Sequence, residues 1–504
     1  MIGAGVAGLS AGCYGRMNGF ETHIIEMHSR PGGLCAHWTR GEYTIDGCVH
    51  WLVGSSPVHP LYRIWQELGV VPGLSMVDLD AFLHLEGTDG EALTLYTDVD
   101  RLEHHLLNIA PEDAGQIHEF AQGVRRLGRL TAVSQGPSRF ATGLRRLGSL
   151  PRVARGVATL RRWRHDTVSE FADSFENAFL RLAFARVFDF PDFPMVGLMM
   201  TLAWLDQRAA GYPVGGSRAL VDALTRRYQE LGGEAEYGCR AVEILVENDR
   251  AIGVRLQDGR ILQADVVISA GDGHTTLFDL LHGRYLGPRL AEAYDTLPVF
   301  PPLLHVAFGV DRSFPDLPPT VLGIDFPLEE PVTIDCRRCT RLTAHVQGID
   351  PTLAPAGKSV IKVTRPSDFE RWSALSKDAE AYGRAKEEAS TQVLSALEQR
   401  FPGLSDTVET VDVATPVTWE RYTGNWQGSF EGWLLTTRTL GHRLPRELAG
   451  LRDFYMAGQW VEPGGGLPTA AKSGRDVIRS VCRRYRRPFV TSIPEPQQKG
   501  RSHV

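Results

Sequence analysis

Hydrophobic and polar positions near the start of the chain follow the order strand, glycine turn, helix, strand. Residues 3–13 lead from glycines into a helical pattern, and 21–26 (ETHIIE) form a short apolar strand. Residues 213–233 have apolar positions three and four apart and end in glycines, which predicts a helix. Residues 234–270 are predicted as consecutive strands with a hairpin turn at Asp258-Gly259. The last block, 453–485, repeats the order strand, glycine turn, helix. This alternation predicts an α/β fold.

The middle of the chain has a different pattern. Residues 166–205 look helical and become increasingly apolar, and over 286–445 strands alternate with one long helix at 378–399. The longest near-apolar stretch, 193–205, is too short to cross a bilayer. Its methionines are expected in a helical core or along the wall of a substrate site. Residues 487–504 are polar and rich in proline, and a flexible tail is expected there.

Composition narrows the class of protein. The chain has 504 residues, 43% of them hydrophobic, and a formal net charge of −6, which fits a globular protein with two large, intertwined domains or with three small ones. Seven cysteines are an odd number and too few for a disulfide scaffold, and no signal peptide is visible, so a reducing, cytoplasmic location is expected. Cys336 and Cys339 lack a second ligand pair at zinc spacing. We interpret them as two independent thiols and expect no metal site.

A basic segment interrupts this acidic chain. Residues 125–164 contain eleven arginines and no aspartate or glutamate. The spacing of Leu, Val and Ala predicts amphipathic helices, divided into short pieces by Pro151 and the glycines. A solvated helical face is one interpretation. Nucleic-acid binding is not expected, because interleaved aromatic residues and a known motif are missing. We favour peripheral contact with a membrane surface, with Phe140, Trp163 and the aliphatic residues on the face opposite the arginines.

Three glycines fit the dinucleotide-binding pattern G-x-G-x-x-G. Gly3 allows a tight turn after a strand, Gly5 lets a pyrophosphate approach the backbone, and Gly8 lets the following helix pack on the sheet. The N-terminus of that helix directs its amides at the phosphates. Glu26 ends the next strand, at the distance where an acid binds ribose hydroxyls. The strand before Gly3 has only two residues, whereas about five are typical. We therefore expect that Met1 is not the true start.

The next motifs resemble one superfamily of flavoproteins. Gly32-Gly33 follows Glu26 after five residues, a spacing similar to that in amine oxidases, Rab GDP-dissociation inhibitors and carotenoid desaturases. Residues 46–51 (DGCVHW) resemble the D-x-G-x-H segment of bacterial-type phytoene desaturases, carotenoid isomerases and retinol saturases. Residues 212–217 (YPVGGS) resemble the Y-P-x-G-G element of the same group. In that group the D-x-G-x-H segment lies near the isoalloxazine ring.

Two C-terminal blocks continue the resemblance. Residues 415–432 resemble the family's TPxTxERYTG block with its two later glycines, and residues 457–474 resemble its C-terminal flavin signature. The resemblance therefore extends from Met1 to about Cys482. It implies FAD rather than NAD as the tightly bound dinucleotide, and a lipophilic substrate taken from a membrane.

The fold implied is α/β: a Rossmann-like FAD-binding domain of the two-dinucleotide-binding-domain flavoprotein type, with an intertwined α+β substrate domain and a helical basic segment. The expected FAD-binding domain comprises residues 1–75, 205–285 and 446–486. The expected substrate domain comprises residues 76–204 and 286–445, including the helical, membrane-associating segment 120–205.

The residues expected to contact FAD come from both ends of the chain. They are Gly3, Gly5, Ala7, Gly8, Glu26, Gly32, Gly33, Gly47, Val242, Ala270, Gly458, Gln459, Gly466 and Leu467. By the resemblance, the backbone of Val242 lies near adenine, and the strand ending at Ala270 closes the nucleotide site; an ordinary hairpin is the alternative. Gln459 stands where many related flavoproteins have aspartate, and an amide can still bind a ribityl hydroxyl.

His50 is the titratable residue that the resemblance places beside the flavin. It could stabilise charge on the reduced flavin or on a cationic intermediate, or move a proton, and a packing histidine is the alternative. Asp46 is expected to bind backbone or cofactor, and Trp51 to form a pocket wall.

Three functions remain open. We favour an FAD-dependent oxidoreductase that desaturates, isomerises or saturates a long isoprenoid or polyene by hydride transfer with flavin N5. An amine or amino-acid oxidase-like enzyme and a non-enzymatic isoprenoid-binding protein are the alternatives. The sequence leaves the direction of the reaction, the electron partner and the oligomeric state undetermined.

Overall fold

Ile2 lies at the centre of a parallel sheet, between β1 (His23–Glu26) and β13 (Val267–Ser269). The outer positions belong to β9 (Glu234–Tyr237) beside β1 and to β19 (Phe454–Met456) beside β13. Because Ile2 runs parallel to both neighbours, the turn after it lies at the carboxyl edge of the sheet, where nucleotides bind in folds of this type. The computed structural model describes residues 1–133, 143–188, 190–318 and 320–494.

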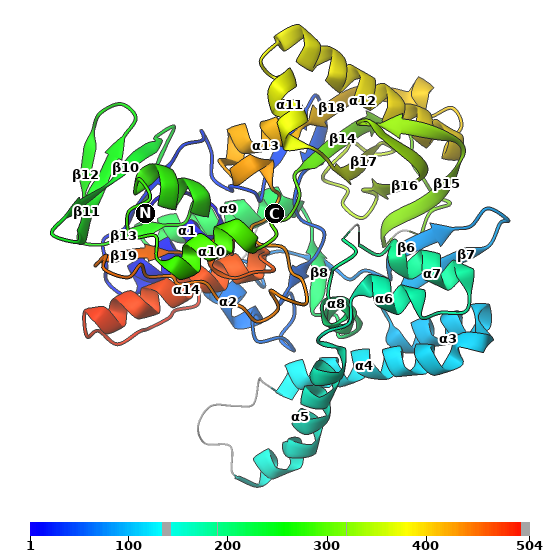
Figure 1. The fold of residues 1–504 in the computed structure, drawn as a ribbon, viewed down its shortest axis with the longest axis horizontal. Helices are drawn as coiled ribbons and strands as arrows, with labels where there is room; N and C mark the ends of the chain where they lie inside the picture. Colours follow the sequence, from blue (N-terminus) through cyan, green and yellow to red (C-terminus); the bar gives the residue numbers. More distant parts are fainter. Residues whose placement is uncertain (134–142, 189, 319, 495–504) are drawn as a thin grey trace, which may run out of the picture.

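Helices and short antiparallel strands complete this first lobe (Figure 1). α1 (Val6–Met17) lies between the sheet and two other helices, α9 (Gly216–Glu230) and α14 (Leu467–Arg484). The smaller elements are α2 (Tyr62–Glu67), α10 (Pro288–Thr296), the antiparallel strands β10 (Ala241–Glu247), β11 (Arg250–Leu256) and β12 (Ile261–Gln263), the pair β2 (His37–Arg40) and β3 (Tyr43–Asp46), and the set β4 (Leu52–Val53), β8 (Ala210–Pro213) and β5 (Met76–Val77).

The second lobe contains a mixed sheet. Its strand order is β18 (Val408–Ala414), β14 (Leu303–Val310), β17 (Ser359–Pro366), β16 (Arg337–Val346), β15 (Val321–Ile334), β6 (Ala81–Glu86) and β7 (Ala92–Tyr96). The predicted long helix is α12 (Ala379–Arg400), which starts where the Asp378 side chain accepts bonds from two backbone amides. α12 packs on this sheet, and α11 (Phe369–Leu375) and α13 (Pro416–Thr423) lie beside it.

A helical region lies at the lower right of Figure 1, below the second lobe, and one of its helices, α5, projects downward. It contains α3 (Val99–Ile109), α4 (Ala114–Val133), α5 (Gly143–Trp163), α6 (Val168–Asp173), α7 (Ala178–Ala185) and α8 (Met195–Asp206). Met195 and Met199 of α8 are fully buried in the core of this region, as the core interpretation predicts. Among the described residues, no helix is both long and apolar enough to cross a bilayer.

Two expectations for the basic segment are wrong. α5 continues through Pro151 rather than breaking there, because one proline removes a single N–H donor from a helix of 21 residues. Trp163 is only 4% exposed and packs at 5.4 Å from the ring of Phe171, because α5 turns its apolar face to α4 and α8 instead of outward. Phe140 lies outside the described residues.

The expected flexible tail is also wrong over its first part. Val490 N donates to Asn18 Oδ1 at 2.8 Å, and the ring of Phe489 lies 5.9 Å from that of Tyr14. Arg227 further donates to Ser492. The apolar and amide groups of this stretch therefore hold it against α1, while residues 495–504 lie outside the described part.

Candidate functional site

Gly3, in the turn between Ile2 and α1, and Gly8, in the first turn of α1, leave little room for a side chain. Gly3 has a φ of +94°, and a Cβ on Gly8 would lie 2.0 Å from the Gly3 carbonyl oxygen. The same Cβ would lie 3.4 Å from the Cβ of Ala270, so β13 closes the turn from the other side. A Cβ on Gly5, in contrast, would make only ordinary contacts, at 3.8 Å and 3.9 Å, with Gly32 and Gly33. Gly5 is therefore dispensable for packing and marks a surface that something else can approach.

Glu26 is fixed at the edge of this turn. Its carboxylate accepts bonds from Ala4 N at 2.7 Å and His28 N at 2.8 Å. Gly32 N donates to Ala4 O at 3.0 Å, which draws the second pair of glycines against the first. The predicted residues at 3–8, 26 and 32–33 therefore form one continuous cradle.

The C-terminal signature joins the same cradle. A Cβ on Gly458, whose φ is +109°, would lie 3.6 Å from the Cβ of Ala7. Gly458 N donates to Ser473 Oγ at 2.9 Å, and the Ser10 hydroxyl donates to Ala471 O at 2.6 Å. α14 begins at Leu467, directly after Gly466, which has a φ of +84°. The two glycine motifs at opposite ends of the sequence thus meet in space.

Gln459 has a partner that sequence reasoning missed. Its Nε2 donates to Asn425 Oδ1 at 3.1 Å, and Trp460 Nε1 donates to the same oxygen at 3.0 Å. Asn425 Nδ2 donates to the carbonyls of Ser429 and Glu431, which fixes the orientation of the amide. Asn425 belongs to the TPxTxERYTG block, whose resemblance is the signal that pointed to this region.

Val242 and Gly47, two further residues predicted to contact FAD, lie outside the glycine cradle. Val242 is 37% exposed and falls at an irregularity in the β10–β11 ladder, where the register passes from Ala241 to Glu243. Cys239 N donates to Glu26 O at 2.8 Å, so this strand begins near the acid. Gly47 follows β3, and a Cβ there would lie 2.5 Å from the ring of Trp419.

Asp46 holds two of the predicted motifs together. Its carboxylate accepts bonds from Cys48 N and Val49 N in the D-x-G-x-H segment. It also accepts from Ser217 N and Ser217 Oγ, both at 2.6 Å, in the Y-P-x-G-G element. This carboxylate is saturated and has a structural role, as expected.

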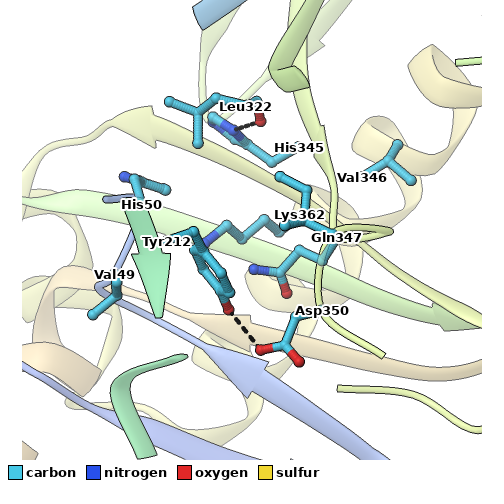
Figure 2. Close-up of a pocket in the computed structure, with 10 residues that line it drawn as sticks. Val49, His50, Tyr212, Leu322, His345, Val346, Gln347, Asp350 and Lys362 are labelled. Atoms are coloured by element: carbon cyan, nitrogen blue, oxygen red, sulfur yellow. Dashed lines mark hydrogen bonds between the residues drawn. The ribbon is translucent and has the colours of Figure 1, made fainter. Parts of the chain in front are cut away.

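His50 lies at a small cavity between the two lobes (Figure 2). Figure 2 shows Lys362 and His345 on the same cavity, with the Tyr212 hydroxyl donating to Asp350 Oδ2 at 3.0 Å at its edge. Lys362 is 1% exposed and donates to the Asp46 carbonyl at 3.0 Å. The ring of His50 stacks on that of His345, with centroids 5.1 Å apart.

The sheet register explains why these side chains meet. His345 of β16 and Lys362 of β17 are direct cross-strand partners, and Lys362 also faces Ala307 of β14. His305 lies two residues before Ala307 and therefore on the same face of the sheet. Sequence reasoning missed Lys362, His305 and His345, because nothing in the sequence gives the pairing of distant strands.

Burial and the neighbouring ammonium keep these histidines neutral. The pKa of His50 is lowered well below 6.5 by burial and by the charge of Lys362. The same causes lower the pKa of His305 to about 3 and that of His345 to about 4. Burial also lowers the pKa of Lys362 itself. Since imidazolium is disfavoured beside a second cation, His50 acts as a neutral hydrogen-bonding group.

An aromatic row leads away from His50. Trp51 stacks near His50 with centroids 6.2 Å apart, and Phe82 follows at 5.5 Å from Trp51. Phe188 lies 5.8 Å from Phe82, and Phe193 lies 4.4 Å from Phe188. Trp51, Phe188 and Phe193 are only partly buried, so this row offers apolar surface from the cavity into the helical region.

The glycine cradle fits FAD. No side chain among the described residues caps the N-terminus of α1, so its first amides are open to an external acceptor, whereas the buried carboxyl of Glu431 bonds to Gly466 N at the start of α14. The space beside Gly5 suits a pyrophosphate. The described residues contain no cluster that could hold a metal ion, and their cysteines are all free.

Known proteins similar to this chain agree on one class. The sequence profile of the family described as flavin containing amine oxidoreductase matches residues 6–481. The chloroplastic prolycopene isomerase of Daucus carota is 24% identical, over 94% of this chain and 78% of its own length. The neurosporene-forming phytoene desaturase of Rhodobacter capsulatus is 25% identical, over 95% of this chain and 93% of its own.

Solved structures share the fold. An oxidoreductase from Methanosarcina mazei superposes with a TM-score of 0.60 at 18% identity and covers 95% of this chain and 99% of its own. Putrescine oxidase bound to putrescine gives 0.56 at 13% identity and covers 96% and 98%. At these identities the likeness concerns architecture alone.

Proposed function

The chain belongs to the flavin containing amine oxidoreductase family, and on this premise we propose that it oxidises, reduces or isomerises a lipophilic isoprenoid polyene. FAD, bound in the glycine cradle, supplies a hydride acceptor or donor at N5. The observation that carries the proposal is the aromatic row from Trp51 to Phe193, which begins at His50. The desaturase and isomerase relatives support the same substrate class.

The proposal assigns the cradle to FAD in the order of the sequence motifs. Gly3 to Gly8 and Gly32-Gly33 hold the pyrophosphate, Glu26 the ribose, and Val242 the adenine. Gly458, Gln459 and the start of α14 at Gly466-Leu467 hold the ribityl chain and the ring. The FAD-binding domain then comprises residues 1–75, 205–285 and 446–486.

The charge around His50 favours a polyene over an amine. Lys362 is a buried amine on the cavity, and the carboxylates of Asp46 and Asp350 are already bonded to neighbouring groups. Among the described residues that line the cavity, no carboxylate is left free as a counter-ion for a protonated amine. The neutral His50 donates or accepts a hydrogen bond there, while the aromatic row excludes water.

Anaerobic turnover tests the proposal. FAD-loaded protein is incubated with defined carotenoid polyenes, with and without a reductant, and the products are analysed by chromatography and mass spectrometry. Loss of two hydrogens identifies a desaturase, gain of two identifies a saturase, and an unchanged mass with a shifted retention identifies an isomerase. Turnover of amines alone, with release of hydrogen peroxide, would contradict the proposal.

The proposal includes peripheral contact with a membrane from the cytoplasmic side. Arg126, Arg129, Arg155 and Arg161 of α4 and α5 are exposed, and within the described residues no acidic side chain forms an ion pair with them. Arg125 and Arg162, in contrast, pair with acids on α3, on α4 and in the loop after α5. The projecting position of α5 in Figure 1 suits contact with anionic headgroups.

A further inference from the structure

The cavity beside His50 is lined by polar atoms that lack partners. His50 Nε2 and Gln347 Oε1 are buried and make no hydrogen bond to any described residue. Among the described residues, Lys362 Nζ donates one hydrogen bond, to the Asp46 carbonyl, although a lysine amine has at least two N–H donors. Buried polar groups in native proteins are nearly always satisfied, so these atoms indicate a polar group that occupies the cavity.

Among the described residues around the cavity, no carboxylate is free to accept a hydrogen bond from Lys362. The Asp46 carboxylate accepts hydrogen bonds from the backbone amides of Cys48, Val49 and Ser217. Asp350 receives bonds from Tyr212, Gly215 and Thr352. A buried amine with unused N–H donors lacks hydrogen bonds that water would supply, so a ligand oxygen that accepts from Lys362 would be favoured over a hydrocarbon.

The size and the walls of the cavity limit the ligand. Its volume is about 30 Å³, which holds one or two water-sized groups and excludes a hydrocarbon chain. Its lining also includes four apolar residues, Val49, Leu322, Val346 and Ile349. This mixture of apolar and polar residues suits the end of a long apolar molecule when that end carries an oxygen atom.

We infer that this cavity binds an oxygen-bearing end group of the polyene, a hydroxyl, carbonyl or carboxylate, with Lys362 as donor and Gln347 or His50 as second partner. The inference rests on the proposed function and narrows its substrate class from hydrocarbons to oxygenated isoprenoids. The apolar part of the substrate then follows the row from Trp51 to Phe193.

Binding to the FAD-loaded protein tests this inference. The probes are retinol, retinoic acid and axerophtene, which share one carbon skeleton and differ in the end group. Affinities are measured by quenching of tryptophan fluorescence for the wild type, Lys362→Met and Gln347→Leu. Lys358→Met is the control, because Lys358 precedes the same strand and pairs with Glu409 away from the cavity.

We expect the wild type and Lys358→Met to bind the oxygenated probes at least about tenfold more tightly than the hydrocarbon. In Lys362→Met and Gln347→Leu this preference shrinks while the affinity for axerophtene is retained. Equal affinity for all three probes in the wild type, or an unchanged preference in both cavity variants, overturns the inference. If only the inference about the cavity is wrong, the protein still binds and converts hydrocarbon polyenes. The proposed function itself is contradicted only if no polyene binds or reacts.

Discussion

A methyl group on Gly458 would lie 3.6 Å from the Cβ of Ala7, although the two residues come from opposite ends of the chain. The contact is reinforced where Ser10 donates to Ala471 O. Two helices that begin at glycine motifs are thereby held against each other at the carboxyl edge of one sheet. A cofactor with two phosphates and a long ribityl chain is the ligand that needs both motifs at once.

The amide pair of Gln459 and Asn425 predicts a stability defect for Gln459→Glu. Asn425 is oriented by its bonds to Ser429 and Glu431, so the substitution places a carboxylate oxygen against the Asn425 oxygen. We expect the free energy of unfolding to fall by about 1–3 kcal/mol, measured by urea denaturation. Gln229→Glu, on the exposed face of α9, is the control and should be neutral. Unchanged stability in Gln459→Glu would argue against this hydrogen bond.

The buried histidines predict a loss of stability in acid. His305 titrates near pH 6.5 when unfolded, but its pKa in the folded protein is lowered to about 3 by burial and by Lys362. The unfolded chain therefore binds more protons between these pH values, and stability falls as the pH decreases below about 6.5.

The matched measurement compares wild type and His305→Phe by urea unfolding at pH 7.5 and pH 5. The wild type should lose about 1–2 kcal/mol more than the variant over this interval, since one pKa unit corresponds to about 1.4 kcal/mol. His104→Asn, an exposed histidine, should behave as the wild type. Parallel pH profiles for wild type and His305→Phe would mean that His305 is not buried in its neutral form.

The exposed arginines of α5 predict binding to anionic vesicles. Reversing Arg155 and Arg161 to glutamate should weaken co-sedimentation with phosphatidylglycerol vesicles at least about tenfold, because each basic residue near such a surface contributes about 1 kcal/mol. The interaction of the wild type should also weaken with added salt. Reversal of Arg218 and Arg226 on α9 keeps the same net charge and should leave binding unchanged. An equal loss in both double variants would point to net charge rather than to α5.

The glycine motifs were predictable because each glycine has a local reason. Gly8 is excluded from carrying a side chain by the Gly3 carbonyl, and this constraint follows from the turn and helix that the sequence itself specifies. The flavoenzyme class and the FAD cofactor followed from the order of these motifs, and family membership confirms both. Their individual contacts with FAD stay predictions.

The cavity was not predictable, because its residues share no local pattern. Lys362 and His345 meet through the register of β16 and β17, which are joined by a loop and whose pairing the sequence does not specify. The outward position expected for Trp163 failed for a related reason. An amphipathic pattern shows that one face is apolar, and only the packing of α5 on α4 and α8 decides what that face meets.

Equilibrium binding of FAD to the apoprotein of Gly5→Ala tests the central claim most directly. A Cβ at Gly5 makes only ordinary contacts with the protein, so folding and melting temperature should match the wild type. The methyl group occupies the space beside the pyrophosphate, so FAD affinity should fall at least about tenfold, which corresponds to 1.4 kcal/mol. Gly383→Ala, in open space on α12, serves as the control and should bind FAD normally. Wild-type affinity in Gly5→Ala, or no FAD binding by the wild type itself, would contradict the account.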